Sequence, residues 1–170
     1  VSDSNYVNYR PRWAPNGRHL LYDATEDIGM ANIYDIGSQT NRLIIPSMAA
    51  IRALDWSPDG RSIVFLQNAA DGFDIWRLAV TGGEPLKITT NGAFSMTRNA
   101  SLSWSPDGRL IAFNPILDGE GVILTIPAAG GEPDRIDLGV EKGTIGYISW
   151  STEGSTIDFN FRTLGNWDIW

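Results

Sequence analysis

The sequence has 170 residues, enough for one domain with a hydrophobic core. Its 13 basic and 20 acidic residues give a net charge of −7, so the average field repels phosphates and nucleic acid is a poor partner. There is no cysteine and no apolar run near the ~18 residues of a membrane span, which excludes a disulfide framework, a thiolate metal site, a cysteine nucleophile and membrane insertion.

A string that begins with tryptophan recurs four times along the chain. WSPDGR begins at Trp56 and again at Trp104, and close variants begin at Trp13 and Trp150. The spacings between these tryptophans are 43, 48 and 46 residues. A period in the forties fits either a four-stranded propeller blade or a pair of helices of the HEAT type, and the pattern inside each repeat decides between them.

Each repeat has the pattern of four short strands. The first strand ends at the tryptophan, and the second is an apolar run at residues 20–22, 63–65 and 111–113, with a weaker copy at 157–159. The third ends near residues 34, 76, 124 and 170, and a Gly-Gly-Glu-Pro turn precedes the fourth in two repeats. Such runs between turn residues are typical of buried strands, and no segment has helical length and period. The sequence therefore predicts an all-β chain, a β-propeller of four-stranded antiparallel blades.

We expect about four blades, over residues 9–45, 51–90, 100–138 and 146–170, in a single propeller segment that covers residues 1–170. The last predicted blade lacks its fourth strand. Because open blades leave strand edges exposed, we expect the segment to belong to a larger ring of about six to eight blades. The partners that would close the ring are the remaining blades of a parent propeller or, as the alternative, further copies of the chain.

The Ser-Pro-Asp-Gly string has the composition of a tight hairpin turn. Proline presets the first central residue of a type I turn, and Gly60 and Gly108 can take the positive φ that follows. Asp59 and Asp107 can accept hydrogen bonds from nearby N–H groups, and Asn16 can do so in the first copy. The alternative is that these aspartates bind a metal or act as acids. A turn explains every residue of the string, so we favour the structural role.

Six of the seven tryptophans occupy two recurring positions of the repeat, which favours packing between blades over an aromatic cage for a ligand. These six are Trp13, Trp56, Trp76, Trp104, Trp150 and Trp170. The exception is Trp167, which we expect on a loop or at the surface.

The last repeat departs from the others at Asp158, which stands where they have Leu21, Val64 and Ala112. Burying an unpaired carboxylate is costly. We therefore expect either a partner for Asp158 or a more open face on this blade.

No catalytic residue is predicted in this segment. His19 is the only histidine, there is no Gly-x-Ser-x-Gly string, and a zinc site of the usual kinds lacks its second histidine. Residues 71–74 and 118–120 could supply oxygen ligands to calcium, but they lack the spacing of an EF-hand loop. We expect no cofactor, with calcium as the alternative.

The succession Trp-Ser-Pro-Asp-Gly-Arg, Ile-x-Phe, Asp-Ile-Trp and Gly-Gly-Glu-Pro resembles the WD-like propeller repeat of the TolB family. Similar repeats build propellers in tricorn protease and in prolyl-oligopeptidase-type peptidases. The resemblance implies a non-catalytic scaffold that binds a protein or peptide in the periplasm or outside the cell, with a cytoplasmic location left open. The alternatives are an accessory propeller of a serine peptidase and the sensor propeller of a regulatory protein.

The longest irregular connection between predicted blades covers residues 91–99 and offers Phe94, Met96 and Arg98. The turn chemistry needs none of these side chains, and variable loops on a rigid scaffold often carry binding sites. We therefore predict that these three residues bind a partner. The alternative is that Phe94 and Met96 fold back under their own loop.

Overall fold

The computed structural model describes residues 9–23, 30–45, 51–89, 94–96, 100–139, 143–163 and 165–170. Every regular element in these ranges is a β-strand, and all strand pairs are antiparallel. No helix in the described part of the chain is long and apolar enough to cross a membrane. The predicted all-β propeller architecture is confirmed.

Four sheets follow one another along the chain, and we call them blades 1 to 4. Blade 1 consists of β1 (Tyr9–Trp13), β2 (His19–Asp23), β3 (Ala31–Asp35) and β4 (Thr40–Ile45). Blade 2 consists of β5 (Ile51–Trp56), β6 (Ser62–Ala69), β7 (Gly72–Ala79) and β8 (Leu86–Lys87). Blade 3 consists of β10 (Leu102–Trp104), β11 (Leu110–Phe113), β14 (Ile123–Pro127) and β15 (Asp134–Ile136). Blade 4 consists of β16 (Thr144–Trp150), β17 (Ile157–Arg162) and β18 (Trp167–Ile169).

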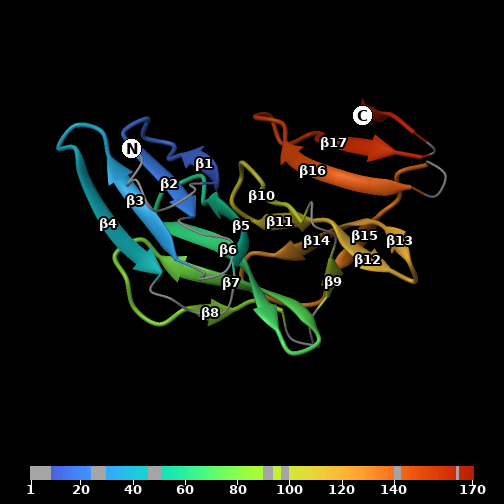
Figure 1. Cartoon of the computed structure of the whole chain (residues 1–170), viewed down its shortest axis with the longest axis horizontal. Helices are drawn as coiled ribbons and strands as arrows, with labels where there is room; N and C mark the ends of the chain where they lie inside the picture. Colours follow the sequence, from blue (N-terminus) through green and yellow to red (C-terminus); the bar gives the residue numbers. More distant parts are fainter. Residues whose placement is uncertain are drawn as a thin grey trace.

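The blades form an arc, and the first strand of each blade lies on its inner side (Figure 1). Strands β1, β5, β10 and β16 are therefore the inner strands, and the inner strands of consecutive blades contact one another. This arrangement brings residues from all four repeats to one surface.

A small fifth sheet joins blades 2 and 3. It consists of β9 (Ser95–Met96), β12 (Pro115–Leu117) and β13 (Glu120–Gly121), in the order β13-β12-β9. Residues 91–99 are predicted to be irregular, but Ser95 and Met96 form a strand. In the structure the chain forms a hairpin at Asp118 and Gly119, whose φ values are 51° and 80°, and this hairpin pairs β12 with β13. The other edge of β12 pairs with β9.

The Pro-Asp-Gly strings form the turns between the first and second strands. Gly60 N–H donates to the Ser57 carbonyl at 2.9 Å with φ of 68° at the glycine, as a type I turn before a left-handed residue requires. Asp59 accepts from the Ser57 hydroxyl at 2.6 Å and from Arg61 N–H at 3.0 Å. The Ser57 hydroxyl bond is the main cause that lowers the pKa of Asp59. The carboxylate is thus committed to the turn.

The third blade repeats these contacts. Gly108 N–H donates to the Ser105 carbonyl at 2.9 Å, and Asp107 accepts from the Ser105 hydroxyl at 2.7 Å and from Arg109 N–H at 3.0 Å. In blade 1, Asn16 accepts from Arg18 N–H at 2.9 Å. The same local chemistry therefore serves three blades.

Three hydrophobic clusters fill the spaces between consecutive blades. Phe65 belongs to the cluster between blades 1 and 2, Phe113 to the cluster between blades 2 and 3, and Phe161 to the cluster between blades 3 and 4. Phe65 and Phe113 have no exposed surface. Burial of these side chains between sheets is the main source of stability in this fold.

The tryptophans are only partly in the core. Trp56 and Trp104 are buried, and the Trp56 indole N–H donates to the Arg12 carbonyl of the preceding blade at 3.1 Å. Trp13 and Trp170, however, are 58% and 56% exposed, so the prediction that both pack between blades is wrong for the described chain. The tryptophan that ends an inner strand packs toward the preceding blade, and no described blade precedes blade 1. Trp170 follows β18, the outermost described strand of blade 4.

Candidate functional site

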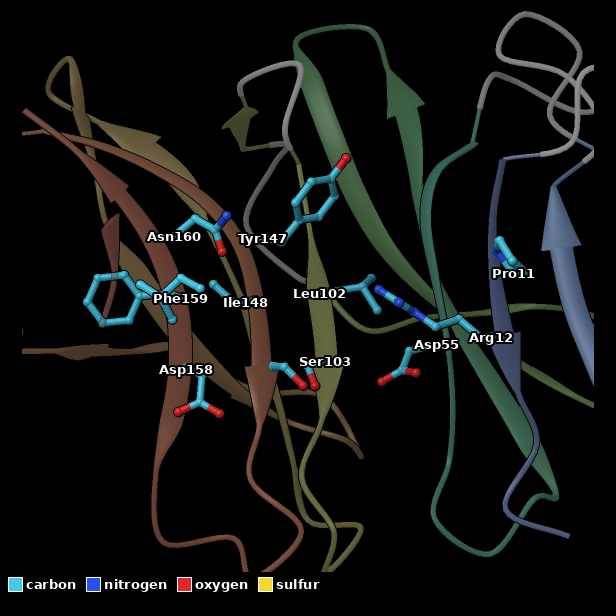
Figure 2. Close-up of a pocket in the computed structure, with 12 residues that line it drawn as sticks. Pro11, Arg12, Asp55, Leu102, Ser103, Tyr147, Ile148, Asp158, Phe159 and Asn160 are labelled. Atoms are coloured by element: carbon cyan, nitrogen blue, oxygen red, sulfur yellow. The ribbon is translucent and has the colours of Figure 1, made fainter. Parts of the chain in front are cut away.

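A groove of about 550 Å³ runs over the inner strands of all four blades (Figure 2). Strands β1, β5, β10 and β16 contribute to its walls, and β17 and β18 extend it over the face of blade 4. The polar and aromatic side chains that line it are Arg12, Asp55, Ser103, Tyr147, Ser149, Asp158, Phe159 and Asn160. The groove is thus the place where side chains from distant parts of the sequence converge.

The residue before each repeat tryptophan links one blade to the next. Trp104 N–H donates to the Asp55 carboxylate at 2.8 Å, and Trp150 N–H donates to the Ser103 hydroxyl at 3.1 Å. The residue at this position of the repeat therefore accepts the main-chain N–H of the next tryptophan. Arg12 has no acceptor in its side chain. In blade 1 the link is a different one, because the Arg12 main-chain carbonyl accepts from the indole N–H of Trp56.

A buried amide makes a second link between blades 3 and 4. Asn114 accepts from Ser101 N–H at 2.7 Å, and its NH₂ group donates to the carbonyls of Ile145 and Gly146 at 3.2 and 2.7 Å. Sequence reasoning missed this residue. The signal that could have found it is a recurring Phe-Asn pair, at 113–114 and again at Phe159 and Asn160.

Asp55 is the one acidic residue among these links in the described chain. Burial raises its pKa, whereas the N–H of Trp104 and the nearby charge of Arg12 act in the opposite direction. Because the blade 3 residue at this position, Ser103, makes the same kind of bond without a charge, the carboxylate is not required for the link itself.

Asp55→Ser is expected to gain stability relative to the unchanged chain as the pH rises from about 4 to 7. The pKa of Asp55 is higher in the folded state than in the unfolded state, so the folded chain binds more protons. The unchanged chain therefore loses stability as the pH rises above the pKa of Asp55 in the unfolded state. Other carboxylates, including Asp59 and Asp107 with their lowered pKa values, are common to both chains and cancel in the difference. Urea denaturation at several pH values measures this difference, and a difference that does not change with pH would contradict the prediction.

Asp158 is exposed and lies on the wall of the groove. At the same position of the repeat, Leu21, Val64 and Ala112 have no exposed surface because the next blade covers them. Of the two outcomes expected for Asp158, the structure therefore has the open blade face. Ile169 on β18 is 83% exposed on this blade, whereas Ile75 at the matching position of blade 2 is fully buried.

The residues predicted to bind a partner lie outside this groove. The ring of Phe94 packs edge-on against Phe113, with 5.1 Å between the ring centroids, and its main chain pairs with Phe73. Met96 is half-buried and lies opposite Pro115 in the small sheet. Arg98 lies outside the described residues. These contacts give Phe94 and Met96 a packing role, and their binding of a partner stays a prediction.

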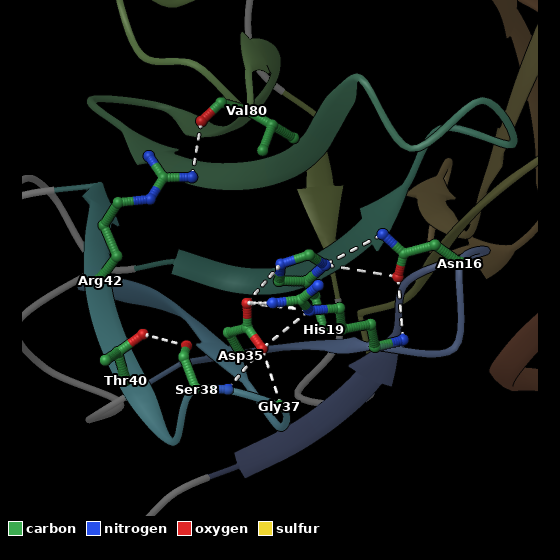
Figure 3. A network of polar contacts seen from close by, with 9 residues as sticks. Asn16, His19, Asp35, Gly37, Ser38, Thr40, Arg42 and Val80 are labelled. Carbon is green, nitrogen blue, oxygen red and sulfur yellow. Dashed lines mark hydrogen bonds and ion pairs between the residues drawn. The ribbon is translucent and has the colours of Figure 1, made fainter.

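His19 takes part in a polar network between the turn of blade 1 and β3 (Figure 3). Its Nδ1 lies 3.0 Å from the Asn16 side chain, and its Nε2 lies 3.5 Å from the Asp35 carboxylate. Asp35 also forms an ion pair with Arg18 at 2.8 Å, and the Arg18 hydrogen bond is the main cause that lowers the pKa of Asp35. These contacts indicate a structural role for His19.

The acidic residues considered as calcium ligands do not come together as a metal site in the described ranges. Asp74 is buried and accepts from the Thr89 hydroxyl at 2.7 Å and from Lys87 Nζ at 2.9 Å. Asp118 and Glu120 belong to the β12–β13 hairpin. Within the described ranges, no three acidic or histidine side chains lie close enough together to hold a metal ion.

The architecture is shared with known propellers. A protein described as TolB from Agrobacterium tumefaciens matches with a TM-score of 0.79 and 23% identity, over 98% of this chain and 58% of that one. TolB from Acinetobacter baumannii matches with a TM-score of 0.82 and 20% identity, over 96% of this chain and 40% of that one. The chain therefore spans 58% and 40% of the lengths of these two proteins, and at such identities the similarity shows the fold alone.

The sequence itself matches a family model. The model of the TolB beta propeller domain (PD40) covers residues 1–170, the whole of the chain. The structure of the chain agrees with this match: blades 1 to 3 are four-stranded antiparallel sheets, and blades 2 and 3 have the Pro-Asp-Gly turn after their inner strand. With the fold and the sequence in agreement, the chain belongs to the TolB beta propeller domain family.

Proposed function

We propose that this TolB-type propeller is a non-catalytic scaffold that binds a protein or a peptide in the groove over its inner strands. The observation that carries the proposal is the groove itself: about 550 Å³, with walls from four blades. It combines polar groups with uncovered apolar surface, because Tyr147 is 47% exposed and Ile169 is 83% exposed. A mixed lining of this kind suits a polypeptide partner.

The chemistry of the groove supports binding over catalysis. Its best-buried polar groups, Asp55 and Ser103, hold main-chain N–H groups of neighbouring blades. The single histidine, His19, is not among the groove residues and bonds to Asn16 near the blade 1 turn. The resemblance to TolB propellers supports a location in the periplasm or outside the cell, which we propose for this function.

The proposal is tested by placing a photo-crosslinking amino acid at position 147 of the chain. A purified partner, or an extracytoplasmic extract of the source cells, is expected to give a discrete adduct from this position. A matched variant carries the crosslinker at Glu153, in the exposed turn of blade 4 outside the groove, and is expected to give none. Unlabelled chain in excess should suppress the adduct. Equal adducts from both positions would show that the groove is not the binding site.

A further inference from the structure

We propose that Asn16 is a site of spontaneous deamidation, in which His19 protonates the ammonia that leaves the side chain. The site lies in the turn between β1 and β2, on the rim where blade 1 meets blade 2 (Figure 3). All of its reacting groups belong to blade 1. The inference concerns the chemistry of this turn and is independent of the proposed binding function.

The amide of Asn16 is held with its nitrogen toward the imidazole. Its Oδ1 accepts from Arg18 N–H at 2.9 Å, which identifies this atom as the oxygen, because an N–H does not donate to an NH₂ group. Nδ2 then lies 3.0 Å from His19 Nδ1. The group that leaves in a deamidation is therefore within hydrogen-bond distance of a side chain that can protonate it.

The imidazole is held from its other side as well. His19 Nε2 lies 3.5 Å from the Asp35 carboxylate, which also forms the 2.8 Å ion pair with Arg18. The charged groups around the ring are thus Asp35 on β3 and Arg18 in the turn, and Arg42 on β4 lines the same pocket. The contacts that indicate a structural role for His19 also keep its Nδ1 at the Asn16 amide.

The residue after Asn16 is Gly17, whose main-chain nitrogen has no neighbouring Cβ to hinder its approach. Its N–H donates to the Ala14 carbonyl at 3.0 Å, so the reaction begins when this one turn bond opens. The nitrogen attacks the side-chain carbonyl carbon of Asn16 and loses its proton to water. The bond from that carbon to Nδ2 breaks, and the proton of the His19 imidazolium goes to the departing ammonia.

Water completes the reaction by opening the cyclic imide that the attack has formed. The proton that the solvent received returns to the imidazole, nothing is oxidised or reduced, and the sum is amide plus water to carboxylic acid plus ammonia. The chain thus gains one negative charge, on the side of His19 opposite Asp35.

The product fits the turn, because blades 2 and 3 already have it. Asp59 and Asp107 stand at this position of the repeat, and each accepts the main-chain N–H two residues further along at 3.0 Å. Asn16 accepts the corresponding N–H at 2.9 Å. An aspartate in place of Asn16 therefore keeps the bond that shapes the turn.

The reaction is followed in the folded, purified chain by digesting samples with trypsin after increasing times of incubation. Trypsin releases Asn16 in the peptide of residues 13–18, and mass spectrometry detects the conversion of its amide to a carboxylic acid. At about pH 6, His19→Gln should slow the conversion about tenfold, because glutamine can hold the amide but cannot protonate ammonia. At about pH 9, where imidazole carries no proton, the two rates should agree.

The chain contains its own control. Asn91 is also followed by glycine, lies outside the described residues, and is released in a separate tryptic peptide, residues 88–98. Its deamidation should be unaffected by His19→Gln at either pH. Circular dichroism and thermal melts establish that His19→Gln is folded. Asn16→Asp, which has the sequence of the product, should melt as the unchanged chain does.

Three results would overturn the inference. Conversion of Asn91 without conversion of Asn16 would mean that the turn protects its asparagine. Equal rates at Asn16 in the unchanged chain and in His19→Gln, at both pH values, would mean that the imidazole takes no part. Conversion of Asn16 only in urea would mean that the unfolded chain reacts and the geometry of the folded turn does not matter.

Discussion

Asn114→Ala is expected to lower the free energy of unfolding by about 4 kcal/mol, since several buried polar groups lose their partner together. The Asn114 side chain satisfies Ser101 N–H and the carbonyls of Ile145 and Gly146, all of which are buried between blades 3 and 4. Alanine supplies neither donor nor acceptor. Asn114 itself is 2% exposed, so the groups that lose its amide are left without a partner away from bulk water.

Urea denaturation of the purified chain measures this effect, and Asn160→Ala is its matched control. Both variants remove the same amide at the same position of the repeat. Asn160 faces the groove and bonds to nothing within the described ranges, so its loss should cost less than about 1 kcal/mol. If the two substitutions cost the same, Asn114 does not hold the two blades together in the way the structure indicates.

The contrast between these two asparagines also shows where sequence reasoning reaches its limit. The Phe-Asn pair recurs in the sequence, but its meaning depends on whether a strand 31 residues or more away lies against it. Turn chemistry is local, and for that reason the roles of Asp59 and Gly60 could be derived from six adjacent letters. Contacts between blades depend on the curvature of the whole arc, which cannot be derived from short stretches of the sequence.

Burial of the repeat tryptophans shows the same division between local and distant causes. Their spacing predicts the strands on which they lie, because hydrophobic period and turn residues act over short distances. It does not predict that Trp56 is buried while Trp13 is 58% exposed, because that difference comes from which blade lies against each one. The groove was likewise beyond prediction, since Arg12 and Asp158 meet at it only through the arrangement of four sheets.

The small sheet explains why the predicted binding loop has a different local structure. A loop rich in apolar residues predicts a partner only if its side chains point away from the protein. Here the chain after β11 turns back through a hairpin, and Ser95 and Met96 add a strand to it. Phe94 therefore lies against a ring of the protein's own core.

Phe113→Ala is expected to lower the free energy of unfolding by about 4 kcal/mol, since it leaves a cavity in a core that has no exposed surface at this point. The side chain belongs to the cluster between blades 2 and 3. Thermal and urea unfolding measure the loss, and Phe94→Ala, a truncation of the same size at a half-buried ring, should cost about 1–2 kcal/mol.

The double variant decides what Phe94 does. The two rings meet edge to face, with 5.1 Å between their centroids. The loss of unfolding free energy in the double variant should therefore differ from the sum of the two single losses by about 1 kcal/mol. Such coupling would mean that Phe94 is held by its own core and has little of its ring to offer a partner. If Phe94→Ala proved neutral for stability and additive with Phe113→Ala, the packing role would be wrong. The loop at residues 91–99 would then again be a candidate binding site, in addition to the groove.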